Sequence, residues 1–244
     1  MKPGKEQIKR IRKLYRKKYR RETGLFVVER WKIIRLFLEA GYRPEQIWAV
    51  RPPEFPADVA WTQVDARTLA AMSDLQHPYD ALAVFRMPQP EPFRPRGLVP
   101  VLDGIQDPGN LGTIIRTADW FGLHQILCSP DSVDAFNPKV IQASMGSLAR
   151  VKVFYGPLEQ WLEANEMPVF GASAGGDNLF ETRLPGTMFL VLGNEGHGIG
   201  AGLQKYISQH LAIPKAARAA AESLNVAQAA GIFMAEWFRQ QRFT

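Results

Sequence analysis

Cysteine is almost absent from this chain of 244 residues, and its one cysteine, Cys128, cannot form a disulfide within the chain. Cys128 ends an apolar run, so we expect a small buried hydrophobic side chain there. The four histidines are scattered, which together with a single cysteine excludes a zinc cluster, and we expect no metal. No apolar run approaches the ~20 residues of a membrane-spanning helix, and no apolar signal-peptide core follows the basic N-terminus. We therefore expect a cytoplasmic protein.

Acidic residues are nearly missing from the first 21 residues, where eleven lysines and arginines stand against Glu6 alone. This segment carries +10, whereas the whole chain carries +6. Its apolar residues recur at helical spacing, which predicts one helix with a narrow apolar stripe of Ile8, Ile11, Leu14 and Tyr15. So dense a charge favours a nucleic-acid partner, with a solvated surface helix as the alternative. Apart from Lys2 and Lys5, the candidate contacts are Lys9, Arg10, Arg12, Lys13, Arg16, Lys17, Lys18, Arg20 and Arg21.

A proline-rich stretch at residues 88–97 predicts an extended linker between two domains, 1–87 and 98–244. The first domain reads as a small α/β unit, in which the basic helix precedes strands at 25–28, 47–50 and 81–85 and helices at 31–40 and 67–72. The second alternates helical segments with apolar runs at 99–102, 125–128, 151–154, 168–172, 188–192 and 210–213. Such alternation predicts an α/β fold with a mostly parallel sheet covered by helices on both faces. Ligands of such sheets bind beyond the carboxyl ends of the strands.

The first motif follows the strand at 99–102 and contains Asn110 and Arg116. Residues 107–109 read as a turn, and we expect Asn110 to cap the helix that follows. Arg116 lies about two turns into that helix. Its guanidinium is either an ordinary exposed charge or a clamp for a phosphate near the strand ends, and the pattern alone does not decide between them.

The second motif, residues 193–200, is rich in glycine, which lets a ligand approach the main chain closely. Glu195 in this loop is either turn polarity or a carboxylate aimed into a site, whereas His197 reads as a solvated histidine. The spacing Gly196-x-Gly198-x-x-Ala201 also fits a dinucleotide fingerprint. That interpretation needs an acidic residue about twenty positions on, and the next strand ends in proline and lysine instead, so a nicotinamide site is disfavoured.

The third motif begins at Ile213-Pro214, continues through an alanine-rich loop and ends in Ser223-Leu224-Asn225. We expect Ser223 to cap a long helix that runs to about Arg239 and whose first-turn amides can meet a ligand. Capping explains the serine but does not explain the asparagine, which is a poor helix former.

Together, these motifs resemble the SpoU, or TrmH, family of the SPOUT RNA methyltransferases, over the whole of residues 98–243. The N-terminal sequence from Tyr19 to Glu29 resembles the substrate-binding domain, similar to ribosomal protein L30e, that many members carry. It departs from that pattern at Arg30, where glycine is usual. The resemblance implies a deep trefoil knot, which general topology rules would not predict, a homodimer and S-adenosylmethionine as cofactor. It also implies methylation of a ribose 2′-hydroxyl in structured RNA, ribosomal rather than transfer RNA because of the L30e-like domain.

By the same resemblance, Arg116 activates the 2′-hydroxyl, and whether it takes the proton or stabilises the alkoxide stays open. The other polar site positions implied are Asn110, Glu195, Ser223 and Asn225. The cofactor would be held largely by main-chain groups, at Leu192, Gly193, Gly196, Ile213, Pro214, Ser223 and Leu224.

One feature departs from the family's pattern: the loop between Pro214 and Ser223 is longer and lacks its glycine. A noncatalytic RNA-binding protein that retains the methyltransferase fold is therefore the alternative function, with a nicotinamide-dependent oxidoreductase third. The C-terminal helix, with Trp237 and Phe238, is a candidate dimer contact, or it merely covers the sheet.

Overall fold

The computed structural model describes residues 3–55 and 58–243, so Lys2 of the basic segment lies outside the described residues. The chain divides into two compact units. The first comprises Met1–Glu91 and Asp134–Ala149, and the second comprises Pro92–Val133 and Arg150–Thr244. The first boundary falls within the proline-rich stretch, but the sequence did not indicate that residues 134–149 pack with the N-terminal unit.

The first unit is built on a four-stranded mixed sheet, in which β4 is antiparallel to both β1 and β2, and β3 is parallel to β2. In sheet order the strands are β1 (Leu25–Glu29), β4 (Ala81–Arg86), β2 (Pro44–Ala49) and β3 (Thr62–Gln63). Its helices are α1 (Lys5–Lys13), α2 (Lys17–Thr23), α3 (Trp31–Glu39), α4 (Ala66–Met72) and α6 (Pro138–Ala143), followed by the 3-10 turn η1 (Ser147–Ala149). The expected small α/β unit is confirmed, and of the four strands in its sheet only the two-residue β3 was not anticipated.

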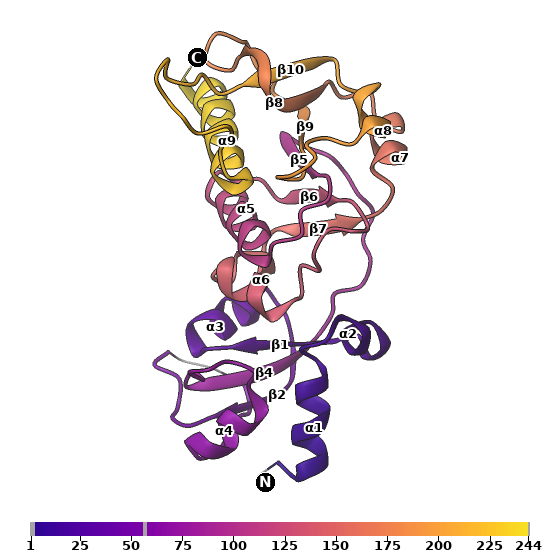
Figure 1. Ribbon diagram of the computed structural model, residues 1–244. Helices are drawn as coiled ribbons and strands as arrows, with labels where there is room; N and C mark the ends of the chain where they lie inside the picture. The colour runs from indigo at the N-terminus through magenta and orange to yellow at the C-terminus, as the bar shows by residue number, and fades with distance from the viewer. Residues whose placement is uncertain (1–2, 56–57, 244) are drawn as a thin grey trace. The chain divides into compact units, whose positions relative to one another are not determined.

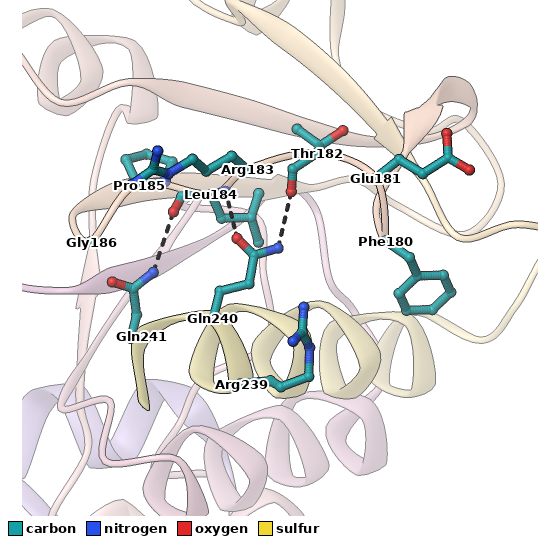
Figure 2. A pocket seen from close by; sticks show the side chains of 10 residues that line it. All are labelled: Phe180, Glu181, Thr182, Arg183, Leu184, Pro185, Gly186, Arg239, Gln240 and Gln241. Atoms are coloured by element: carbon teal, nitrogen blue, oxygen red, sulfur yellow. Dashed lines mark hydrogen bonds between the residues drawn. The ribbon is translucent and has the colours of Figure 1, made fainter. Parts of the chain in front are cut away.

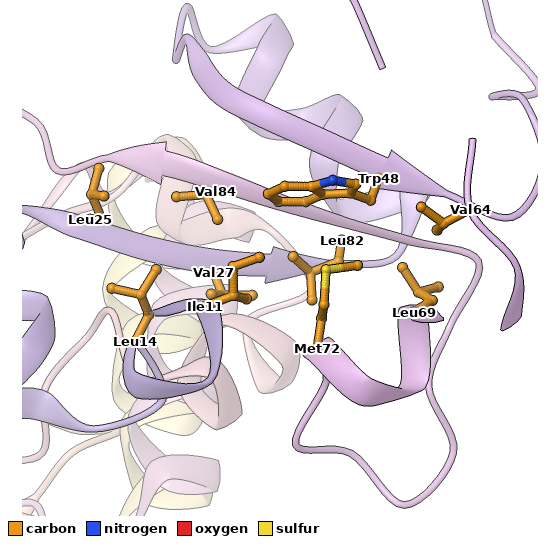
Figure 3. Packing of buried hydrophobic residues seen from close by; sticks show 10 residues of the cluster. All are labelled: Ile11, Leu14, Leu25, Val27, Trp48, Val64, Leu69, Met72, Leu82 and Val84. Carbon is orange, nitrogen blue, oxygen red and sulfur yellow. The ribbon is translucent and has the colours of Figure 1, made fainter. Parts of the chain in front are cut away.

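The predicted single basic helix is wrong, because the structure has two helices separated at Leu14–Arg16. Leu14 and Ile11 are buried in a hydrophobic cluster under the sheet, where Figure 3 shows them beside Val27 and below Val84. The Tyr15 hydroxyl donates to the buried carboxylate of Glu29 at 2.5 Å. The break between the helices thus coincides with two stabilising contacts, the burial of Leu14 and the Tyr15–Glu29 hydrogen bond.

Arg20 is not available to nucleic acid, because its side chain is 1% exposed and lies within the first unit. Its Nε and Nη2 atoms donate to Asp134 Oδ2 at 2.9 and 2.5 Å, and its Nη1 atom donates to the Leu14 carbonyl at 2.9 Å. The Phe26 and Phe136 rings also pack together, with centroids 4.7 Å apart. These contacts hold residues 134–149 against the N-terminal unit, and the expectation that Arg20 binds nucleic acid is corrected.

The second unit contains a six-stranded sheet in which every strand pair is parallel, as the sequence predicted. In sheet order its strands are β10 (Gln209–Ala212), β8 (Val169–Asn178), β9 (Met188–Leu192), β5 (Leu98–Leu102), β6 (Gln125–Cys128) and β7 (Lys152–Tyr155). The helices α5 (Pro108–Trp120) and α9 (Val226–Phe243) lie side by side on one face, and α7 (Leu158–Glu163) and α8 (Ala201–Gln204) lie on the other (Figure 1). A trefoil knot in this unit stays a prediction.

Buried apolar residues fill both faces of this sheet. On the α7 and α8 side, Leu158, Leu162 and Leu203 pack against strand residues such as Val101 and Val191. Cys128 is fully buried, which confirms the expected small core side chain, and burial raises the pKa of its thiol. Across the described ranges, no helix is both long and apolar enough to span a membrane.

Candidate active site

Three of the predicted site residues, from three segments far apart in the sequence, form one hydrogen-bonded chain. The Asn225 side-chain amide donates to Asn110 Oδ1 at 2.9 Å, and the Asn110 amide in turn donates to Glu195 Oε1 through a short hydrogen bond. Asn110 follows β5, Glu195 follows β9 and Asn225 follows β10, so the chain spans the carboxyl edge of the parallel sheet. We call Asn225–Asn110–Glu195 the amide–carboxylate chain.

The helix caps explain why these two asparagines face each other, and both predicted caps are corrected. Asp107, not Asn110, caps α5: its Oδ1 accepts from the Asn110 main-chain N–H at 2.8 Å, and Pro108 follows as the first helical residue. The Asn110 side chain is therefore free to point outward. Asn225, not Ser223, caps α9, because its Oδ1 accepts from the Ala227 N–H at 2.9 Å.

Capping also sets the direction of the chain. Because Asn225 Oδ1 is used by the helix, its amide nitrogen must point away, toward Asn110 Oδ1. Asn110 then has only its own amide nitrogen left for Glu195, and a carboxylate is the acceptor that this donor needs. The helix terminus thus orients a carboxylate that lies on the solvent-exposed side of the site.

The glycine-rich loop after β9 is closed on itself. Asn194 and Gly198 exchange two main-chain hydrogen bonds of 3.0 and 2.8 Å, and Asn194 Oδ1 accepts from the Gly196 N–H at 2.8 Å. A Cβ atom on Gly193 would overlap the main chain of Gly198, so only glycine fits at this position. The glycines therefore make a tight loop that carries Glu195 at its tip.

Two further residues, which were not among the predicted site residues, fix this loop to the end of β5. The Asn194 amide donates to the Gly104 carbonyl at 2.8 Å, and Asp103 Oδ2 accepts from the Gly200 N–H at 2.7 Å. Their sequence signal was available, since each is an Asx residue at or just after the end of a buried strand, where its side chain commonly bonds loop amides. They are positioning residues for Glu195.

Arg116 does not join the amide–carboxylate chain. It lies six residues after Asn110 on α5, with an exposed side chain that makes no hydrogen bond or ion pair to any described residue. Thr113 and Trp120 are exposed on the same side of this helix, one turn before and one turn after Arg116. A guanidinium held on a rigid helix without a carboxylate partner is free to bind an anion.

The residues predicted to hold the cofactor lie along the carboxyl ends of β9 and β10. Leu192 is buried at the end of β9, whereas Ile213 is half-buried and residues 214–225 form an exposed segment without regular structure. Leu224 is 46% exposed, and the main-chain N–H groups of Ser223 and Leu224 make no hydrogen bond within the described ranges. An open apolar side chain beside free amides suits a flat heteroaromatic group such as adenine.

A pocket of about 460 Å³ lies elsewhere in the second unit, between residues 180–186 and the end of α9 (Figure 2). Gln240 accepts from the Leu184 N–H at 2.8 Å and donates to the Thr182 carbonyl at 3.0 Å, which ties the loop to the helix. None of the predicted site residues lines this pocket. Nor does the described part of the chain contain three or more His, Cys, Asp or Glu residues grouped to hold a metal ion.

Sequence comparison adds an independent observation to this geometry. The SpoU rRNA Methylase family matches residues 97–235, and the MRM3-like substrate binding domain matches residues 5–83. The chain belongs to the SpoU rRNA methylase family. The resemblance inferred from the three motifs is thereby confirmed, and the nicotinamide alternative has no remaining support.

Relatives of this SpoU-family chain match it along most of its length. It is 30% identical over 237 residues to the 23S rRNA (guanosine(2553)-2′-O)-methyltransferase RlmP of Bacillus subtilis (strain 168), covering 94% of both chains. A TrmH-family structure from Porphyromonas gingivalis superposes with a TM-score of 0.87 at 37% identity, covering 98% of this chain and 99% of that chain. The S-adenosylmethionine-bound rRNA methyltransferase of Sinorhizobium meliloti superposes with a TM-score of 0.84 at 27% identity, covering 97% and 95%.

Proposed function

We propose that this protein transfers a methyl group from S-adenosylmethionine to a ribose 2′-hydroxyl in ribosomal RNA. The observation that carries the proposal is the amide–carboxylate chain, which joins the first turn of α5, the loop after β9 and the cap of α9 at the carboxyl edge of the sheet. The similarity to RlmP supports ribosomal RNA as the substrate, and a ribosomal substrate is encountered in the cytoplasm.

S-adenosylmethionine supplies an electrophilic methyl group on a positively charged sulfur. Leu224 would cover the adenine, while the main-chain groups of Gly193, Gly196, Ile213, Pro214 and Ser223 would contact the cofactor's polar edges. The tight loop at Gly193 keeps these groups in place before the cofactor arrives, so that less ordering is needed on binding.

Glu195 and Arg116 have complementary tasks in this proposal. Glu195 uses one carboxylate oxygen for Asn110, and its second oxygen can accept a hydrogen bond from a ribose hydroxyl. Arg116 contributes a fixed positive charge, because guanidinium groups do not act as bases in proteins. It therefore stabilises the alkoxide that forms at the 2′-oxygen and binds the neighbouring phosphate, while the hydroxyl proton leaves to water.

The chain is also proposed to act as a homodimer, but through α5 rather than through Trp237. Trp237 is buried within the second unit, where its Nε1 donates to the Pro185 carbonyl at 3.0 Å, and Phe238 packs against Phe121. Trp120 on α5, by contrast, is 84% exposed. A large aromatic side chain in water beside Arg116 suits an interface that a second copy would cover next to the site.

The experiment that tests this function is methyl transfer from radiolabelled S-adenosylmethionine to unmodified 23S ribosomal RNA transcribed in vitro. We expect label in a ribose with the wild type. For Arg116→Ala we expect a loss of about 100-fold in kcat with an unchanged Kd for S-adenosylmethionine, because Arg116 acts on the hydroxyl rather than on the cofactor. Arg116→Lys keeps the charge and should recover only part of the rate.

Two outcomes would contradict the proposal. Methyl transfer by Arg116→Ala at an undiminished rate would remove the proposed role of the guanidinium. Tight RNA binding by the wild type without cofactor binding or label would favour a noncatalytic RNA-binding protein, and would point to the long loop at residues 214–223 as the cause.

A further inference from the structure

Arg30, at the junction of β1 and α3, has a backbone conformation that normally belongs to glycine. Its φ of 80° and ψ of 123° lie where side chains are strained, and of the described non-glycine residues only Met145 also has a positive φ. The conformation is fixed from both sides, since the Arg30 N–H donates to the Ala81 carbonyl at 2.8 Å and the Arg30 carbonyl accepts from the Ile33 N–H at 2.9 Å. Glycine would adopt this conformation without strain. A function of the arginine side chain would therefore account for the backbone strain.

The Arg30 side chain lies over the ring of Tyr79, with its Cζ atom 5.2 Å from the ring centroid. Tyr79 is 41% exposed, so part of its ring faces solvent. Within the described ranges Arg30 has no carboxylate partner, because the neighbouring Asp80 bonds to Arg51 at 3.5 Å and to the Trp31 N–H at 3.2 Å. The guanidinium N–H groups of Arg30 and part of the Tyr79 ring therefore remain open to a ligand.

The Arg30–Tyr79 pair lies beside a packed cluster of aromatic rings around Trp31. The Trp31 indole donates to the Arg51 carbonyl at 3.0 Å and meets Phe55 and Trp61 edge to face, with centroids 5.8 and 6.3 Å away. Because the packed rings below hold the junction in place, Arg30 and Tyr79 are positioned before any ligand binds.

We propose that Arg30 and Tyr79 form a stacking platform for an unpaired base of the RNA substrate. Aromatic rings and arginine planes are the groups on which proteins stack splayed-out bases, and the open guanidinium N–H groups can bind the adjoining phosphate. The platform is linked to the basic helices through the loop at residues 73–80, in which Asp74 pairs with Arg12 of α1. This inference rests on the proposed function, in that it takes RNA to be the substrate.

The test uses the full chain and two fluorescently labelled RNAs, a short single strand and a duplex of the same length. We expect Tyr79→Ala to bind the single strand about tenfold more weakly and the duplex unchanged, because only unpaired bases can stack. Tyr79→Phe retains the ring and should bind like the wild type. The salt dependence of single-strand binding should keep its slope in Tyr79→Ala, because stacking releases no counterions.

Arg30→Gly gives a second readout that a purely structural role would not produce. It should weaken single-strand binding by about tenfold while Tm stays the same or rises, by about 2–4 °C for each kcal/mol of strain relieved. Arg35→Gln is the matched control: it removes the same charge from an arginine that also lies over a ring, that of Phe55, but that already pairs with Glu39. Its binding should not change.

Three results would overturn an assignment, and they are distinguishable. The platform would be contradicted if Arg30→Gly and Tyr79→Ala bound the single strand as tightly as the wild type does. It would also be contradicted if the wild type bound no single strand. Loss of binding in Arg30→Gly together with a fall in Tm would make Arg30 structural. A wild type that shows the expected binding pattern but methylates no ribosomal RNA would overturn the proposed function and leave the platform standing.

Discussion

At the residue scale, Glu29 makes the stability of the first unit depend on pH. Its carboxylate is buried and accepts hydrogen bonds from Tyr15 at 2.5 Å and from Ser73 at 2.7 Å. Burial raises the pKa of Glu29, and the two hydrogen bonds only partly offset this effect. The folded chain therefore holds the Glu29 proton more tightly than the unfolded chain does, and the free energy of unfolding falls as pH rises through the raised pKa.

Glu29→Gln should remove this dependence, because it mimics the protonated side chain. We expect the variant to be at least as stable as the wild type at about pH 8 and to lose this advantage at about pH 4. Each unit of pKa shift is worth about 1.4 kcal/mol, or about 3–6 °C in Tm for a chain of this size. Thermal unfolding of both proteins across this range is the measurement, and identical pH profiles would contradict the assignment.

The site asparagines show how far single residues could be interpreted without a structure. Asn110 and Asn225 were identified as site residues by their motifs, but their caps were misassigned by two or three positions. Capping chemistry is shared by Asp, Asn and Ser, so Asp107 and Ser223 were equally plausible capping residues. The caps that form leave both asparagine amides free to meet, and the resulting Asn225–Asn110 contact joins residues 115 positions apart and has no local signature.

At the scale of elements, α1 and α2 divide their charges between binding and stability. Lys9, Arg10 and Arg21 are exposed and have no ion pair within the described ranges, so they can release counterions from RNA. Replacing all three with glutamine should weaken RNA binding and lower the slope of log K against log salt by about 0.7 for each phosphate that is no longer neutralised. Titrations of a labelled RNA at several salt concentrations measure this slope.

Arg20 provides the contrast within the same two helices. Arg20→Met leaves Asp134 without its buried partner, which costs about 3–5 kcal/mol and should lower Tm, while the salt slope of the RNA complex stays the same. A lower salt slope of RNA binding in Arg20→Met, or an unchanged salt slope in the triple glutamine variant, would contradict this division of the charges between RNA binding and stability. The sequence alone could not distinguish the two roles, because Arg20 and Arg21 are adjacent arginines. Only the fold shows that Asp134, which is distant in sequence, pairs with Arg20.

At the scale of the whole molecule, the parallel sheet was predictable and the composition of the two units was not. Continuous apolar runs that alternate with helical segments are typical of a parallel sheet, and each predicted run became a strand. Residues 134–149 leave the second unit and pack with the first, as the Phe26–Phe136 and Arg20–Asp134 contacts show. Such a crossing depends on pairs distant in sequence, and no local pattern encodes it.

The proposed homodimer leads to a prediction that also concerns the whole molecule. Trp120 is exposed on α5, one helical turn beyond Arg116, so a second copy that covers it would also close over the site. Trp120→Glu places a charge in that interface and should shift the protein from dimer to monomer in sedimentation velocity runs at micromolar concentration. Phe180→Glu, at a 53% exposed aromatic that follows β8 and lies outside α5, is the control that should remain dimeric. If Trp120→Glu stays dimeric, or if the wild type is a monomer with full activity, the site is complete within one chain and the exposed tryptophan needs another explanation.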